Sequence, residues 1–260
     1  MRVLVTAIGS LSALNVIRSL RRMDPNGFIL GTDTHEISHV PLAPRVDAFR
    51  RAVHATDPDY VPDLLRVCER EHIGMLIPLT DPEVDVLAGA AAAFGEIGTI
   101  LAVARPRAVQ TARDKLQLHD HFEDHPAVRV IPTILLSGAD VKALPEPMLA
   151  KPRTGRNSEG QMVFHQAISA AHLVGQPGDL IAQPLLTGEV VTVDVVKDRH
   201  GHVACVPRYE LKRTANGAGT TVRVTRDNEV EGLAATIVNE LGLTGVSCIE
   251  FLKVSSAQLM

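Results

Sequence analysis

Residues 151–160 read Lys-Pro-Arg-Thr-Gly-Arg-Asn-Ser-Glu-Gly, and they place a lysine at the end of a short apolar strand, directly before a small polar loop. An ammonium group in that position can sit on phosphate oxygens as a point charge. Gly155 and Gly160 allow backbone N–H groups to turn toward the same oxygens, and Ser158 adds a hydroxyl donor. An ordinary hairpin with a solvated lysine fits these ten residues as well. The stretch alone leaves both interpretations open.

The order of the motifs around this loop separates the two interpretations. In chain order they are Arg113-Asp114-Lys115 at the start of a predicted helix, the loop itself, Gln183-Pro184-Leu185-Leu186-Thr187-Gly188-Glu189 at the start of a predicted strand, a segment with Lys212, Arg213, Gly217, Gly219 and Thr220, and Cys248-Ile249-Glu250-Phe251-Leu252. This order resembles the ATP-grasp superfamily, specifically members similar to the carbamoyl-phosphate synthase large subunit. The resemblance covers the whole chain, including Gly-Thr-Asp at 31–33 and Pro-Leu-Thr-Asp-Pro-Glu at 78–83.

The resemblance implies ATP and Mg²⁺ as cofactors and a role for particular residues. The positions that match ATP contacts of the family are Lys115, Lys151, Gly155, Ser158, Gly160, Gln183 and Leu186, with Glu189 as the nearest substitute for a ribose contact. Adenine would be held by Gln183 and by the backbone of Leu186. Lys212 or Arg213 matches a contact to the terminal phosphate or to an acyl-phosphate. Glu250 matches the first Mg²⁺ ligand.

The reaction of the family explains why these residue types are needed. A carboxylate oxygen attacks the γ-phosphate of ATP, and an amine or similar nucleophile then attacks the acyl-phosphate that forms. Cationic groups offset the charge that spreads over the phosphoryl oxygens. The resemblance therefore implies an ATP-dependent ligase for small-molecule carboxylate and amine substrates. A nucleotide-binding module without turnover is the alternative.

Three features depart from the family pattern. Asn157 replaces the second glycine of the loop, although Asn tolerates left-handed backbone angles better than most residues. Pro184 and Val190 stand where family members often place acidic or polar nucleotide contacts. The chain stops at Met260, whereas in the family a strand like 246–252 runs into Glu-x-Asn-Pro-Arg, which supplies further metal ligands. Because Mg²⁺ needs a near-octahedral array of oxygens, we expect a truncated fold that binds nucleotide and turns over poorly, with its last strand lacking a hairpin neighbour.

The first third of the chain predicts a separate α/β domain. Apolar strands are expected at 2–6, 28–32, 75–78 and 100–103, with helices between them. This alternation is typical of a parallel, doubly wound sheet. Only Gly9 fits a dinucleotide glycine pattern, so we expect a Rossmann-like scaffold without its dinucleotide, and Asp33 as a strand-end residue rather than a ribose ligand. Asp81 and Glu83 flank a proline in a turn, which favours helix capping over a substrate or interdomain role.

The remainder of the chain predicts an α+β fold of short strands and hairpins. The expected elements are helices at 114–123 and 229–241 and strands at 128–132, 148–151, 180–183, 189–197, 202–207, 221–225 and 246–252. We expect a pre-ATP-grasp domain over 1–110 and an ATP-grasp domain over 111–260. The latter would contain a small nucleotide-binding lobe at about 126–186 and an incomplete C-terminal lobe at 187–260.

Composition narrows the class of protein. The formal net charge is −4 and the basic residues are scattered, so nothing points to a nucleic-acid partner. The three cysteines form no CxxC pair, and we expect buried, reduced thiols in a cytoplasmic protein. The N-terminus lacks a signal-peptide pattern, and no apolar run reaches the ~18 residues of a membrane span. The dispersed histidines, among them His119, His121 and His125, do not predict a metal cluster. A homo-oligomer remains open.

Overall fold

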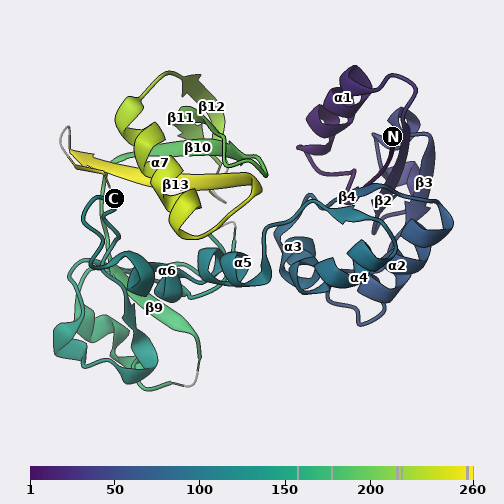
Figure 1. The fold of residues 1–260 in the computed structure, drawn as a ribbon. Coiled ribbons are helices and arrows are strands. Elements are labelled where there is room, and N and C mark those ends of the chain that lie inside the picture. Colours follow the sequence, from purple (N-terminus) through teal and green to yellow (C-terminus); the bar gives the residue numbers. More distant parts are fainter. Residues whose placement is uncertain (157, 177, 215–216, 218, 256–257, 260) are drawn as a thin grey trace. The chain divides into compact units, whose positions relative to one another are not determined.

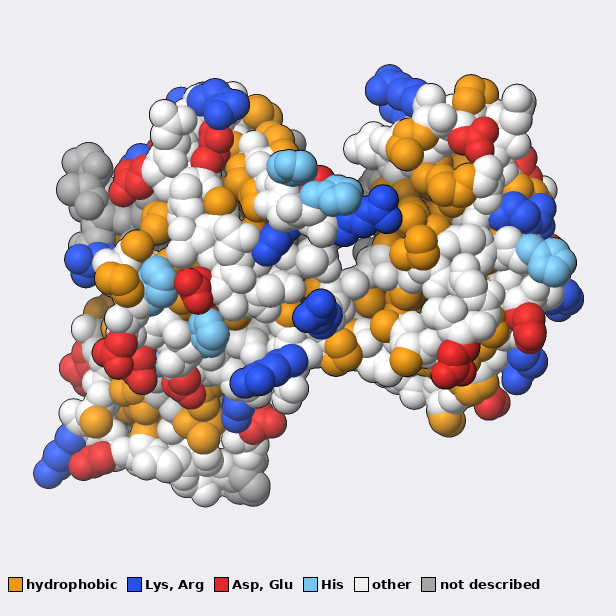
Figure 2. Space-filling model, in the orientation of Figure 1, with side chains coloured by type: hydrophobic (Ala, Val, Ile, Leu, Met, Phe, Trp, Pro, Cys, Tyr) orange, Lys and Arg blue, Asp and Glu red, His pale blue; other side chains and the backbone are white. Residues whose placement is uncertain are grey.

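The computed structural model describes residues 1–260 except 157, 177, 215–216, 218, 256–257 and 260, which are grey in Figures 1 and 2. The chain divides into two compact units, Met1–Val109 and Gln110–Met260. On the face that Figure 2 presents, Lys and Arg side chains are interspersed with Asp and Glu. Among the described residues, no helix is both long and apolar enough to cross a membrane.

The first unit is built on a five-stranded parallel sheet. Its strands are β1 (Arg2–Val5), β2 (Phe28–Asp33), β3 (Ala48–Arg51), β4 (Met75–Ile77) and β5 (Ile100–Leu101), in the order β3-β2-β1-β4-β5 (Figure 1). Its helices are α1 (Ala13–Met23), α2 (Tyr60–Arg70), α3 (Asp81–Leu87) and α4 (Ala91–Glu96), with 3-10 turns at Ile37–His39, Ala43–Arg45 and Ala88–Ala90. The predicted parallel sheet is confirmed, although its last strand ends at Leu101 and not at Val103.

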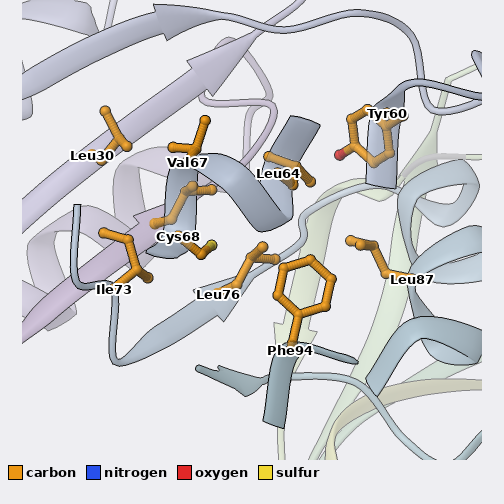
Figure 3. Close-up of a cluster of buried hydrophobic side chains, with 10 residues drawn as sticks. Leu30, Tyr60, Leu64, Val67, Cys68, Ile73, Leu76, Leu87 and Phe94 are labelled. Carbon is orange, nitrogen blue, oxygen red and sulfur yellow. The ribbon is translucent and has the colours of Figure 1, made fainter. Parts of the chain in front are cut away.

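Hydrophobic clusters cover both faces of this sheet. Successive side chains of a strand point to opposite faces, so Leu4 joins one cluster while Val3 and Val5 join the other. The first cluster, drawn in Figure 3, packs strand residues against α2 and against Phe94 of α4. The second cluster packs α1 on the other face through Ile17. Burial on both sides explains why the strands of this unit read as continuous apolar runs.

Glu83 secures the turn at the carboxyl end of β4. Its carboxylate accepts hydrogen bonds from Thr6 Oγ1 and from Tyr60 Oη, both at 2.8 Å, and from the backbone N–H of Thr80 at 3.1 Å. Glu83 is buried and lies in the first turn of α3. The residue therefore has the helix-capping role that its place in the turn predicts.

Asp33 is the last residue of β2, and its side chain contacts the turn that follows β1. Its Oδ2 accepts a hydrogen bond from the backbone N–H of Gly9 at 2.8 Å, and its Oδ1 lies 2.8 Å from His35 Nδ1. A Cβ atom on Gly9 would come within 2.8 Å of that same Oδ2, so the close approach requires glycine. The backbone amide at this turn is thus already paired inside the protein.

The second unit contains two antiparallel sheets, of which the smaller has four strands. Helix α5 (Pro106–Arg113) spans the boundary between the units, and α6 (Lys115–Phe122) follows. The strands are β6 (Ile134–Leu135), β7 (Met148–Pro152), β8 (Met162–Phe164) and β9 (Leu180–Pro184), in the order β6-β9-β7-β8. The 3-10 segments Leu136–Gly138, Val141–Ala143 and Ala167–Leu173 contribute to a core with Met148 and Ala150. The predicted strand at 128–132 is wrong, since that segment forms no strand and ends in a proline, which has no N–H for a ladder.

The larger sheet has five strands and one helix. The strands are β10 (Glu189–Lys197), β11 (Val203–Arg213), β12 (Gly219–Val224), β13 (Gly245–Ser255) and β14 (Gln258–Leu259), in the order β12-β11-β10-β13-β14. Helix α7 (Asn228–Glu240) packs against β10 and β11 (Figure 1). Val191, Val193 and Val195 of β10 are fully buried on one face. The alternating residues, Thr192 and Asp194, therefore lie on the opposite face, which we call the open face.

Three expectations for this sheet need correction. Strand β11 runs on to Arg213 instead of ending at Pro207, because it pairs with both β10 and β12. Strand β13 does have a hairpin neighbour, since β14 pairs with it at Lys253 and Ser255. Cys68 is buried as predicted, but Cys205 is only half-buried and Cys248 is exposed. Cys248 pairs with Asp194 across β10 and β13, so it lies on the open face and not in the core.

Candidate functional site

Two lysines, one on the smaller sheet and one at the start of α6, lie near each other and are partly removed from water. Lys151 is half-buried on β7. Lys115 is the first residue of α6, and its Nζ donates to the carbonyls of Pro152 at 3.1 Å and Arg153 at 3.2 Å. Burial, and then the charge of Lys115, lowers the pKa of Lys151 to about 8. Burial also lowers the pKa of Lys115. Because burial disfavours the charged form of both lysines and Lys115 disfavours that of Lys151, a nearby anion would stabilise both, and the pair fits a phosphate group.

Asp114 fixes the position of Lys115. Its Oδ1 accepts from the backbone N–H groups of Leu116 at 3.0 Å and Gln117 at 3.1 Å, so it caps α6. The same carboxylate accepts from Arg153 Nε at 2.7 Å. No sequence motif assigned a role to Arg153, whose only signal was its place two residues after Lys151. This ion pair ties the start of α6 to the loop that follows β7.

The loop between β7 and β8 has the backbone that its glycines predict. Gly160 has a φ of +69°, and a Cβ there would come within 3.0 Å of Pro152 Cγ. Ser158 has a φ of +57°, which is costly for a residue with a Cβ and is typical of functional loops. Gly155 is exposed, as are Ser158 and Gly160. Asn157 lies outside the described residues, so its predicted left-handed role stays a prediction.

The residues expected around adenosine are distributed over both sheets. Gln183 lies opposite Leu149 in the β7–β9 ladder, and the two share a face with Lys151. Its side chain is buried and donates from Nε2 to Thr133 Oγ1 at 2.8 Å. Leu186 is half-buried in the segment that joins β9 to β10, and Glu189 is exposed at the start of β10. The structure thus brings Gln183 to the lysine face, whereas Glu189 belongs to the larger sheet.

On the larger sheet the structure distinguishes between Lys212 and Arg213. Arg213 Nη2 lies 2.9 Å from Glu250 Oε1, and its Nε lies 2.8 Å from Glu210 Oε2. Lys212 forms no side-chain hydrogen bond or ion pair with the described residues. Arg213, and not Lys212, therefore reaches Glu250.

The two sheets converge at this point. A Cβ placed on Gly217 would come within 2.9 Å of Ser158 Oγ and 3.6 Å of Arg213 Nη2, so the loop after β7 meets the loop after β11. Glu250 also acts on Lys151, since its negative charge raises the pKa of that lysine against the larger effects of burial and Lys115. These contacts and charge effects link Lys115, Lys151, Ser158, Arg213 and Glu250 into one candidate site.

The donor set fits the phosphates of ATP and a metal bound to them. Two ammonium groups, a guanidinium and a serine hydroxyl are donors of the kind that bind phosphate. Among the described residues, no group of three or more His, Cys, Asp or Glu side chains could hold a metal ion. Mg²⁺ in nucleotide sites commonly uses one or two carboxylates together with phosphate oxygens and waters. Glu250 fits as one such carboxylate.

Comparison with solved structures supports the fold. The chain is similar to N5-carboxyaminoimidazole synthetase of Staphylococcus aureus in complex with ADP, at 14% identity and a TM-score of 0.75 over 99% of this chain and 68% of that one. It is similar to the biotin carboxylase domain dimer of Hydrogenobacter thermophilus 2-oxoglutarate carboxylase with MgADP, ADP and bicarbonate. The identity is 16% and the TM-score 0.75, over 99% of this chain and 62% of that one. It is also similar to L-amino acid ligase of Bacillus licheniformis, at 13% identity and a TM-score of 0.74 over 99% of this chain and 64% of that one. The chain spans about two thirds of the length of these proteins.

Comparison with protein families covers both units. Residues 3–102 match the PylC-like N-terminal domain, and residues 112–258 match the ATP-grasp domain. A search of curated protein sequences finds no match. The second match extends over more than half of the chain, with the lysines, the glycine loop and Glu250 inside it, so the protein belongs to the ATP-grasp family.

Proposed function

We propose that this chain binds ATP with Mg²⁺ and uses the γ-phosphate to activate a small-molecule carboxylate for attack by an amine or similar nucleophile. The observation that carries the proposal is the pair of partly buried lysines, Lys115 and Lys151, because burial lowers both pKa values and the charge of Lys115 lowers that of Lys151 further. A binding anion with several charges removes that cost. The solved relatives are bound to ADP or MgADP or are named as ligases, which agrees with this choice of anion.

Each residue of the site has a role in the proposed reaction. Lys115 and Lys151 hold the phosphates, and the loop from Thr154 to Gly160 covers them with backbone N–H groups and the hydroxyl of Ser158. Gln183, Leu186 and Glu189 are the proposed adenosine contacts. Arg213 stabilises the charge on the transferred phosphoryl group. Glu250 would be a ligand of Mg²⁺, which when bound supplies charge neutralisation on the phosphate oxygens.

The nucleotide-binding module without turnover is the second candidate. It is favoured by the ion pair between Arg213 and Glu250, at 2.9 Å, because that contact occupies the carboxylate proposed for the metal. Assembly as a homo-oligomer and a cytoplasmic location stay predictions.

A hydroxylamine trap separates the two candidates. The protein is incubated with ATP, Mg²⁺, hydroxylamine and a panel of carboxylates that includes amino acids and bicarbonate. In a ligase, the carboxylate takes the γ-phosphoryl group and ADP leaves. Hydroxylamine then attacks the acyl carbon, phosphate leaves, and a hydroxamate forms. We expect carboxylate-dependent ADP release with matching hydroxamate, lost in Lys151→Met and kept in Lys142→Met, an exposed lysine of the same sheet region. Nucleotide binding without carboxylate-dependent ADP release would favour the binding module instead.

A further inference from the structure

The end of β11 departs from regular strand geometry. In a regular strand, residues two apart share a face, so Lys212 would accompany Glu210 and Arg213 would point away from both. The β11–β12 ladder instead shifts register between Glu210 and Lys212 and again between Lys212 and Arg213. Irregularities of this kind re-aim side chains and are common near active sites. The shift explains why the guanidinium of Arg213 reaches both Glu210 and Glu250.

Glu210 is a buried carboxylate that contacts both neighbouring strands, β10 and β12. Its side chain is only 3% exposed. Thr192 Oγ1 on the neighbouring strand β10 donates to Glu210 Oε1 at 2.5 Å, which fixes the orientation of the carboxyl group. A Cβ on Gly219 would come within 3.0 Å of the same carboxyl group, so the start of β12 lies close over it and glycine avoids a tight contact there. No sequence motif assigned a role to Glu210.

The second oxygen of Glu210 lies against Arg213 without a hydrogen bond. Glu210 Oε2 is 2.8 Å from Arg213 Nε, but that N–H group donates to the carbonyl of Gly217, also at 2.8 Å. Among the described residues, Glu210 Oε2 therefore has no hydrogen-bond donor. A buried carboxylate requires a nearby cation, and removing the cation is strongly unfavourable. Arg213 is thus bound firmly to Glu210 through charge.

The contact of Arg213 with Glu250 is of a different kind. Glu250 is 55% exposed, so water can solvate its carboxylate without the arginine, and exposed ion pairs are weak. The Nη2 end that touches Glu250 is also the end that lies near Ser158 of the phosphate loop. One end of the guanidinium is therefore anchored in the sheet, while the other end can change its partner at little cost.

We propose that Glu210 is a positioning residue that holds Arg213, and that Arg213 exchanges Glu250 for the terminal phosphate when ATP binds. The exchange frees the Glu250 carboxylate and keeps the guanidinium aimed by Glu210. This inference rests on the proposed function, because it requires nucleotide at the site. It assigns to Glu210 an effect that acts through Arg213 and that depends on the γ-phosphate.

Calorimetric titration with two nucleotides at constant Mg²⁺ tests the proposal. ADP lacks the γ-phosphate, whereas adenylyl imidodiphosphate carries one that is not transferred. We expect Glu210→Gln and Arg213→Met to weaken binding of adenylyl imidodiphosphate about tenfold, since a charge-assisted phosphate contact is lost. Binding of ADP should change less than twofold. Glu231→Gln, which removes a carboxylate paired with Arg226 at 2.9 Å elsewhere in the unit, should change neither.

A selective loss of adenylyl imidodiphosphate binding distinguishes the proposed positioning role of Glu210 from a merely structural one. Equal weakening of both nucleotides, or of neither, would overturn the inference while leaving nucleotide binding intact. If Glu210→Gln fails to fold, Thr192→Val replaces it, because it removes only the hydroxyl donor to Oε1 and keeps the charge. The selective loss for adenylyl imidodiphosphate should then be about threefold, and a loss shared with ADP would again refute the proposal. A wild-type chain that binds neither nucleotide would overturn the proposed function and this inference with it.

Discussion

The lowered pKa of Lys151 makes nucleotide affinity depend on pH in a calculable way. Burial and Lys115 hold this pKa at about 8 in the free protein. Bound phosphates favour the charged ammonium, so the pKa rises on binding and the nucleotide prefers protonated Lys151. The protonated fraction of the free protein falls from about 0.9 at pH 7 to about 0.1 at pH 9 for such a pKa. The apparent Kd for ATP should therefore rise about tenfold between these pH values, or about 1.4 kcal/mol.

The same shift predicts uptake of a proton during binding. At pH 8 about half of the free molecules lack the proton on Lys151, so binding should take up about half a proton per site. Calorimetry in two buffers of different ionisation enthalpy measures this uptake. Lys151→Met should abolish most of it, while Lys142→Met, an exposed lysine, should retain it. An affinity that is constant from pH 7 to 9, with no proton uptake, would refute the assignment of Lys151 to the phosphates.

Two further predictions follow from the loop and from the first unit. ATP should slow hydrogen–deuterium exchange at Thr154–Arg156 and Ser158–Gly160, because nucleotide phosphates would accept hydrogen bonds from these exposed amides. Exchange in the hairpin turn at Asp198–His202 should stay unchanged. Equal exchange of the loop with and without ATP would mean that it is a plain hairpin. Glu83→Gln should lower the free energy of unfolding by about 2 kcal/mol in urea titrations, since an amide NH₂ would face the donors of Thr6, Tyr60 and Thr80. The matched change at an exposed position, Glu69→Gln, should have little effect. Similar stability of the two variants would contradict the buried capping network.

The fold of the first unit can be predicted from local sequence because its signals are local. The apolar runs of β1, β2 and β4 are flanked by turn residues, and amphipathic helices separate them. The smaller sheet of the second unit is harder to predict. Its first strand, Ile134–Leu135, is only two residues long and owes its existence to pairing with Ala182 and Ile181 of β9. Such a strand has no periodicity of its own. The sequence therefore predicts a strand at the neighbouring segment 128–132 instead.

The residues of the candidate site also differ in how far local sequence predicts them. Lys115, Lys151 and the glycines carry motif signals, because the chemistry needs those residue types at fixed places in the chain. The choice between Lys212 and Arg213 carries no such signal, since it depends on a register shift in the pairing of β11 with β12. Arg153 and Glu210 were missed for a related reason. Each is held in place by a partner distant in sequence, Asp114 and Thr192 respectively, and only the folded chain brings these together.

The central claim is that ATP binds through the lysine pair, and calorimetric titration of ATP into Lys151→Met and Lys142→Met tests it most directly. Both variants lose one lysine charge, but only Lys151 is partly buried beside Lys115. We predict that Lys151→Met weakens ATP binding by at least tenfold, as expected for loss of a charge-assisted phosphate contact, and that Lys142→Met binds as the wild type does. Equal affinity in the two variants would contradict the account.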